Sequence, residues 1–185
     1  MYNIKMIHEI LCSIVFKYLT FYSKHVFRRI SKIMRSIDIV DLKNIDYKYL
    51  RKIDNEILQN YTRVKMLNAS YNIYINNINN LTSLKELITH GNMRDDDISG
   101  LNLEILNANS AYKIKNVNHM SKLRKLSATY ECGIDNKGIE CINLHEIDVS
   151  NNVKIDKNNL KHMTELKNII DDYDDYYFMS SKWKY

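Results

Sequence analysis

Apolar residues recur through most of the chain as a short, spaced pattern and not as long uninterrupted runs. In the copy Leu84-x-x-Leu87-x-Thr89-x-x-Asn92, the first and fourth residues are apolar and the sixth is small. The fourth and sixth positions point to the same side of an extended segment, so they predict a short strand with one buried face. Successive copies are 19 to 22 residues apart, and the others are Val64-x-x-Leu67-x-Ala69-x-x-Asn72, Leu103-x-x-Leu106-x-Ala108, Leu123-x-x-Leu126-x-Ala128, Leu144-x-x-Ile147-x-Val149-x-x-Asn152 and Leu166-x-x-Ile169.

One such unit cannot cover its own apolar face, so the units are expected to stack side by side. Stacking predicts a parallel sheet whose interior row is formed by Leu67, Leu87, Leu106, Leu126 and Ile147. Between the strands, apolar residues at three-residue spacing predict short helices or helical turns. Glycines in these connections suggest backbone with positive φ; they are Gly91, Gly100, Gly133 and Gly138.

The copies resemble the leucine-rich repeat, whose period lies in the same range. The resemblance implies an α/β solenoid over residues 63–171, with a parallel β-sheet on the concave face and short helices or turns on the convex face. It also implies that Asn72, Asn92 and Asn152 hydrogen-bond the backbone of the turn leaving each strand, and that Cys132 replaces this asparagine in one unit. The repeat wording and the Asn-, Ile- and Lys-rich composition are similar to short repeat proteins of large DNA viruses of amoebae.

Residues 1–37 have a helical periodicity in place of the repeat. Apolar residues at three- and four-residue spacing form one stripe and predict short helices; they include Ile7, Ile10, Leu11, Ile14 and Leu19.

The wording of this segment resembles an F-box. His8 stands where that motif has a proline, and no tryptophan follows Lys32. The resemblance implies that the five apolar residues of the stripe bind a Skp-type adaptor; the alternative is an N-terminal helical cap over the open end of the solenoid. The segments that carry the resemblance are Ile7-His8-Glu9-Ile10-Leu11, Tyr18-Leu19 and Ile30-Ser31-Lys32.

Two further segments flank the repeats. Residues 38–62 are transitional, and Leu42-x-x-Ile45-x-Tyr47 predicts a degenerate first repeat one period before Val64. Residues 172–185 interleave aspartates with aromatic residues, which predicts a C-terminal cap or tail. A helical stripe is expected after the degenerate repeat, through Leu50, Ile53, Ile57 and Tyr61.

The composition narrows the class of protein. A chain of 185 residues with 45% hydrophobic and 26% charged residues fits one globular domain. Cys12, Cys132 and Cys141 form no paired framework, which favours a reducing intracellular compartment, expected to be the cytoplasm, or the host cytoplasm if the viral resemblance holds. We expect neither a signal peptide nor a membrane span. A net charge of +5 is modest and does not favour a nucleic-acid partner.

No arrangement of reactive residues predicts catalysis, a metal site or a cofactor, so we expect a non-enzyme. His119 and His162 precede methionines at equivalent places in two units, which repeat copying explains. Cys132 and Cys141 lie in one unit without the second pair that a zinc site needs. Phosphate-binding loops and nucleophile elbows are not found in the sequence.

The residues flanking the interior row point to the opposite side of the predicted sheet and form the candidate binding surface for a protein partner. Core packing does not require three of them, Met66, Ile88 and Ile105, to be apolar. Two others, Glu146 and Asp148, would favour a basic partner segment. The whole set is Met66, Asn68, Glu86, Ile88, Ile105, Asn107, Lys125, Ser127, Glu146 and Asp148.

These observations predict a protein–protein interaction module that binds its partner through the concave face. The F-box resemblance implies an alternative, in which the chain is a substrate receptor that recruits a target to a cullin ubiquitin ligase. Copurification of a Skp-type adaptor with residues 1–60 would separate the two.

Overall fold

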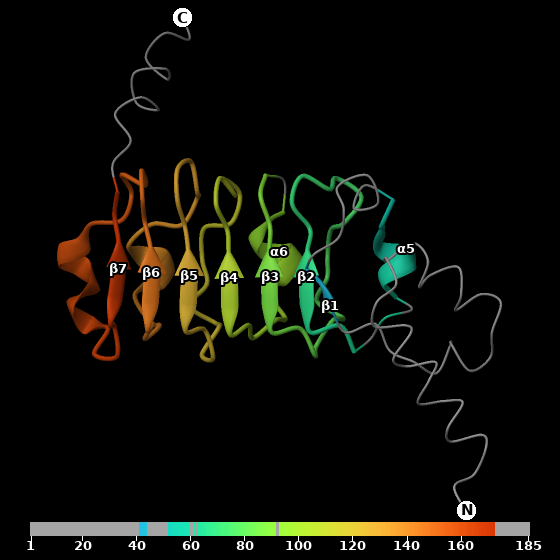
Figure 1. Cartoon of the computed structure of the whole chain (residues 1–185), viewed down its shortest axis with the longest axis horizontal. Helices are drawn as coiled ribbons and strands as arrows, with labels where there is room; N and C mark the ends of the chain where they lie inside the picture. The colour runs from blue at the N-terminus through green and yellow to red at the C-terminus, as the bar shows by residue number, and fades with distance from the viewer. Residues whose placement is uncertain (1–40, 44–51, 60, 62, 92, 173–185) are drawn as a thin grey trace, which may run out of the picture.

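Seven short strands form a single all-parallel sheet in a computed structural model that describes residues 41–43, 52–59, 61, 63–91 and 93–172 (Figure 1). The strands lie in chain order, and each pairs with the next. This confirms the predicted α/β arrangement with a parallel sheet. The strands are β1 (Asp41–Leu42), β2 (Met66–Asn68), β3 (Glu86–Ile88), β4 (Ile105–Asn107), β5 (Lys125–Ser127), β6 (Glu146–Asp148) and β7 (Asn168–Ile170).

The interior row forms as predicted. The middle residue of each strand from β2 to β6 pairs with the middle residue of the next. Their side chains are at most 2% exposed, because the short strands turn this column toward the core. The five residues are Leu67, Leu87, Leu106, Leu126 and Ile147.

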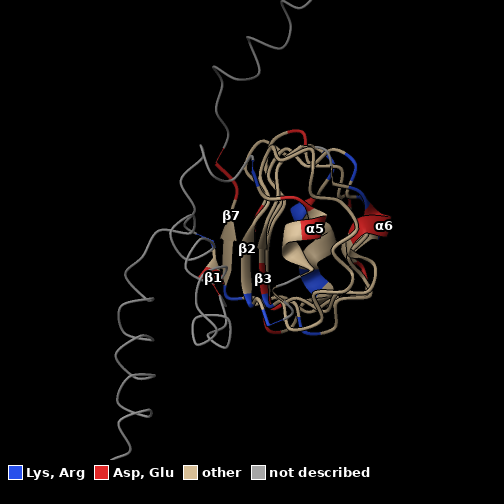
Figure 2. Ribbon diagram, turned by 90° about the vertical axis from the view of Figure 1, so that its right-hand side faces the viewer, with Lys and Arg blue, Asp and Glu red and all other residues tan. Residues whose placement is uncertain are grey.

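The return segments form a second wall opposite the strands. Figure 2 is viewed along the row of strands and shows the strands on one side, α6 on the other and α5 in front of the interior. The helices are short: α5 (Asn55–Leu58), α6 (Asp95–Ile98) and the 3-10 helices η1 (Lys137–Ile139) and η2 (Lys157–His162). Residues of this wall such as Ile78, Ile114 and Val117 are buried against the strand row. The core therefore runs the length of the stack between the two walls.

Asparagine side chains connect successive units along the second wall. Asn79 Nδ2 donates to the Asp96 carbonyl at 2.7 Å, and its Oδ1 accepts the Gly100 N–H at 2.8 Å. Asn118 repeats both bonds, to the Lys137 carbonyl at 2.7 Å and from the Cys141 N–H at 2.9 Å. Each of these asparagines thus bonds a carbonyl of a short helix, α6 or η1, and an N–H just after that helix in the next unit.

The predicted register of the first repeat is wrong by three residues. Leu42 pairs with Leu67 and is 1% exposed, so Leu42 occupies the interior row, which is the fourth position of a repeat and not the predicted first position. The step from Leu42 to Leu67 is therefore 25 residues, longer than the later steps. The segment between β1 and β2 contains α5, which Asp54 caps by accepting the Ile57 N–H at 2.8 Å.

Several predictions concern residues outside the described part of the chain. They are the helical, F-box-like segment 1–37 with its five adaptor-binding residues, Ile45, Tyr47 and Leu50 of the transitional segment, Asn92, and residues 173–185 of the C-terminal segment. Within the described residues, no helix is long and apolar enough to cross a membrane.

Candidate interaction surface

The strand face is the outward surface of β2 to β6, made by the ten residues that the sequence marks as partner-binding. Because the strands are in register, these residues form two columns, one at the start and one at the end of the strands. All ten are partly or fully exposed, so the structure brings the whole predicted set onto one surface. The start column is Met66, Glu86, Ile105, Lys125 and Glu146, and the end column is Asn68, Ile88, Asn107, Ser127 and Asp148.

Three apolar side chains lie together at the β2 end of the strand face. Met66 and Ile105 flank Glu86 in the start column, and Ile88 lies between them in the end column of β3. All three are half-buried. Neighbouring strands are about 4.8 Å apart, so Ile88 on the central strand β3 is a diagonal neighbour of both Met66 and Ile105, and the three side chains border one patch. A partner that buries this patch would form a complex stabilised by the hydrophobic effect.

The charged side chains of the strand face have partners within the chain. Glu86 forms an ion pair with Lys43, and its side chain is only 13% exposed. Lys125 Nζ lies 3.0 Å from Glu146 Oε2 on the next strand. A basic partner segment would therefore compete with Lys125 for Glu146.

Most polar residues of the end column also shape the strand ends. The side-chain oxygens of Asn68, Asn107 and Asp148 each accept the N–H of the residue two positions later, at 3.0, 3.2 and 3.1 Å. This bond is the Asx turn that ends a short strand. Ser127 is the exception in the column, and there Asn109 Oδ1 of the neighbouring unit accepts the Thr129 N–H at 3.1 Å.

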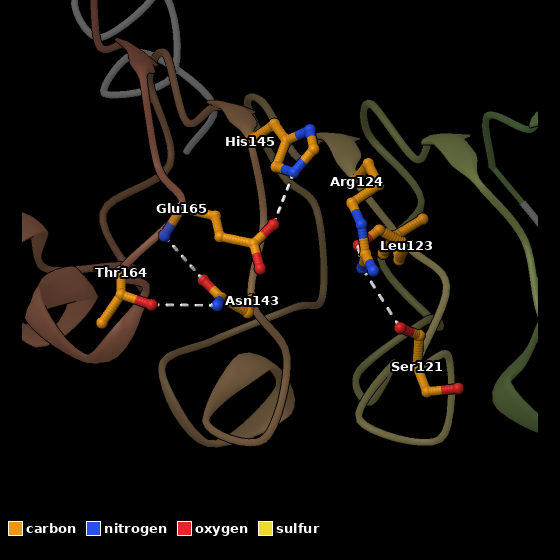
Figure 3. Close-up of polar contacts among 7 residues, drawn as sticks. All are labelled: Ser121, Leu123, Arg124, Asn143, His145, Thr164 and Glu165. Carbon is orange, nitrogen blue, oxygen red and sulfur yellow. Dashed lines mark hydrogen bonds and ion pairs between the residues drawn. The ribbon is translucent and has the colours of Figure 1, made fainter.

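Polar contacts also link the units at the strand-start edge (Figure 3). Asn143 Nδ2 donates to Thr164 Oγ1 at 3.2 Å and its Oδ1 accepts the Glu165 N–H at 3.1 Å. His145 Nε2 lies 2.6 Å from Glu165 Oε2. Arg124 Nη1 donates to the carbonyls of Ser121 and Leu123, both at 3.1 Å. The bonds of Asn143 and His145 therefore link neighbouring units, whereas those of Arg124 lie within its own unit.

The two histidines that precede methionines at equivalent places also have contacts within the chain. His119 Nε2 lies 3.3 Å from the Ile98 carbonyl, and His162 Nε2 lies 3.3 Å from the Ile139 carbonyl. Each thus contacts the same place in the preceding unit, in agreement with repeat copying. Among residues 41–43, 52–59, 61, 63–91 and 93–172, no group of three His, Cys, Asp or Glu side chains could hold a metal ion.

Cys132 and Cys141 differ in their surroundings. Cys132 is buried, and its N–H donates to the Thr129 carbonyl at 3.3 Å, the bond that Asn72 and Asn152 make in their own units. Burial raises the pKa of its thiol above the usual value, so it stays protonated at neutral pH. Cys141 is exposed.

A row of exposed apolar residues at the turn edge, where the chain leaves the strands, was not predicted. The rings of Tyr71 and His90 meet edge to face with centroids 5.4 Å apart, and Lys113 Nζ lies 5.2 Å from the Tyr112 ring centroid. Tyr71 and Tyr130 each follow an interior-row residue by four positions. Comparison of this position among the repeats of the sequence would have identified these two residues of the exposed row. The row is Tyr71, Ile73, Tyr74, Tyr112, Tyr130 and Val153.

An open hollow of about 540 Å³ lies beside this row, between α6 and the following unit. Asp95 Oδ1 accepts the N–H groups of Lys115 and Asn116 at 2.7 and 3.1 Å, so this carboxylate links two units. The residues that line the hollow include both positively and negatively charged side chains. They are Arg94, Asp95, Asp96, Tyr112, Lys113 and Lys115.

No protein-family model matches the chain, and no curated protein matches it.

Proposed function

We propose that the chain is a leucine-rich-repeat protein that works as a non-enzymatic protein-interaction module and binds its partner through the strand face. The regular step between units and the parallel strands support the repeat assignment. A stack of this kind presents an extended surface along its strands, which suits protein recognition.

The apolar patch of Met66, Ile88 and Ile105 is the observation that carries the proposal. The core does not need these side chains, because they lie on the opposite side of the sheet from the interior row. They leave apolar area exposed beside polar neighbours, the arrangement found at protein interfaces. The interior-facing positions of the same strands are occupied by buried leucines, which belong to the core.

The test compares the proteins captured by three forms of the full chain. The unchanged chain serves as one bait, and the double variant Ile88→Lys, Ile105→Lys places two cations in the patch. Val153→Lys is the matched control, because Val153 is 79% exposed and lies on the turn edge. We expect proteins that bind the unchanged chain and Val153→Lys and are lost from the double variant, with equal circular dichroism for all three. Capture of the same proteins by the double variant would rule out the strand face.

A further inference from the structure

The regular burial of the interior row ends at β7. Ile169 pairs with Ile147 and continues the row, yet it is 47% exposed, whereas the row residues of β1 to β6 are at most 2% exposed. All three residues of β7 are exposed, and Ile170 is 41% exposed. Within the described part of the chain, no strand pairs with the far side of β7. An edge of this kind offers unpaired backbone groups to another strand.

The sequence around β7 is self-complementary in the antiparallel direction. When two copies of Lys167-Asn168-Ile169-Ile170-Asp171 are paired about Ile169, each Lys167 lies opposite an Asp171. Asn168 then lies opposite Ile170, and the two Ile169 side chains meet at the centre. Opposite charges and apolar side chains placed directly across a strand pair both stabilise it.

We propose that a second copy of this chain binds at β7, with the two β7 strands antiparallel about a two-fold axis perpendicular to the sheet. The same edge is used by both copies, so the contact closes into a dimer and does not propagate. The two Ile169 side chains cover each other, which continues the interior row across the interface. Lys167 and Asp171 form two symmetric ion pairs at its ends.

Contacts within the chain hold the residues after β7 in place for this pairing. Asp171 forms an ion pair with Lys157 of η2, and the Asp172 N–H donates to Ser150 Oγ at 3.1 Å. Lys167 of the second copy therefore joins Lys157 as a second cation beside Asp171.

Directly opposite residues of an antiparallel pair face the same side of the sheet. The strand faces of the two copies consequently lie on one side of the joined sheet, and one dimer offers two copies of the strand face to a partner. Binding of both faces by a bivalent partner would raise the overall affinity. The dimer itself does not depend on what the strand face binds.

The first test measures the molar mass of the full chain by light scattering across a wide concentration range. We expect the mass to approach twice 22.0 kDa as the concentration rises. Ile169→Lys places a cation at the centre of the interface and should raise the dissociation constant at least about tenfold, whereas Val153→Lys should leave it unchanged. A chain that stays monomeric at every concentration overturns the proposal, whatever covers β7 in the monomer, the chain's own residues 173–185 included. A dimer that Ile169→Lys does not weaken also overturns it.

The second test uses the two charged positions to identify the register. Lys167→Glu places glutamate opposite aspartate, and Asp171→Lys places lysine opposite lysine, so each variant alone should dimerise more weakly than the unchanged chain. Mixed together, the two variants place every lysine opposite an acidic residue, and a heterodimer should form. Absence of a heterodimer, with both variants folded, would contradict antiparallel pairing about Ile169.

Discussion

At the scale of single residues, the repeated asparagines stabilise the turns by bonding in two directions. Asn152 is 6% exposed, and its Nδ2 donates to the Ala128 carbonyl of the preceding unit at 2.7 Å while its Oδ1 accepts the Lys154 N–H at 3.0 Å. Asn72 bonds the Ile53 carbonyl and the Tyr74 N–H in the same way, at 2.8 and 2.9 Å. The predicted role of these two residues is confirmed.

Asn152→Ala should lower the free energy of unfolding by about 1–3 kcal/mol, because it leaves buried backbone groups without partners. Asn159→Ala is the matched control, since Asn159 is exposed and its change should be within about 0.5 kcal/mol. Urea unfolding followed by circular dichroism measures both. Equal effects of the two substitutions would contradict the role of Asn152.

The two described cysteines should differ in reactivity. Cys141 is exposed and should react with iodoacetamide in the folded chain, whereas Cys132 should react only after unfolding because burial raises its pKa. Peptide mass spectrometry measures each site separately. Fast modification of Cys132 in the folded chain would show that the thiol is accessible.

The raised pKa of Cys132 also fixes the sign of a pH effect. The thiol of the unfolded chain ionises first as the pH rises past about 8.5. The folded state therefore loses stability above that pH until its own, higher pKa is reached. The decline should be smaller in Cys132→Ala, measured against the same variant at pH 7. An identical decline would mean that other groups cause it.

At the scale of elements, close contact between backbones explains glycines that the sequence assigned to positive φ. Only Gly91 among the four has a positive φ, 94°. A Cβ on Gly138 would lie 2.0 Å from the Lys115 carbonyl oxygen, and one on Gly133 would lie 2.5 Å from that of Tyr112. At both places one unit packs directly on the backbone of the previous unit.

Gly138→Ala should therefore lower the free energy of unfolding by about 1–3 kcal/mol or more, because the backbone carbonyl cannot move without separating two units. Gly100→Ala serves as the comparison, since its Cβ would meet only the side chain of Asn79 at 3.3 Å. Thermal unfolding of the two variants measures the difference. A Gly138→Ala chain as stable as Gly100→Ala would show that the units do not pack this closely.

The turn position four residues after each interior-row residue could not be identified from the sequence pattern. It has a positive φ in five units, at Tyr71, Gly91, Ser110, Tyr130 and Asn151. Only one of these is glycine, so a search for glycine could not find the turn. The pattern of the strands is strong because burial selects apolar residues, whereas this turn accepts several residue types.

At the scale of the whole molecule, the interior row and the ten residues of the strand face were predictable because a parallel stack repeats the same burial in every unit. The register of β1 was not, because Ile39-x-x-Leu42 and Leu42-x-x-Ile45 both fit the pattern. The contacts of Asn79 and Asn118 were also not predicted. Their bonding partners lie in other units, which a local pattern cannot identify.

Hydrogen–deuterium exchange of the full chain, with and without a protein captured by it, tests the role of the strand face most directly. We expect the partner to slow exchange in β2, β3 and β4 and in the residues beside them, where Met66, Ile88 and Ile105 lie. Slower exchange confined to α6, η1 and η2 on the opposite wall, with no change in the strands, would contradict the account.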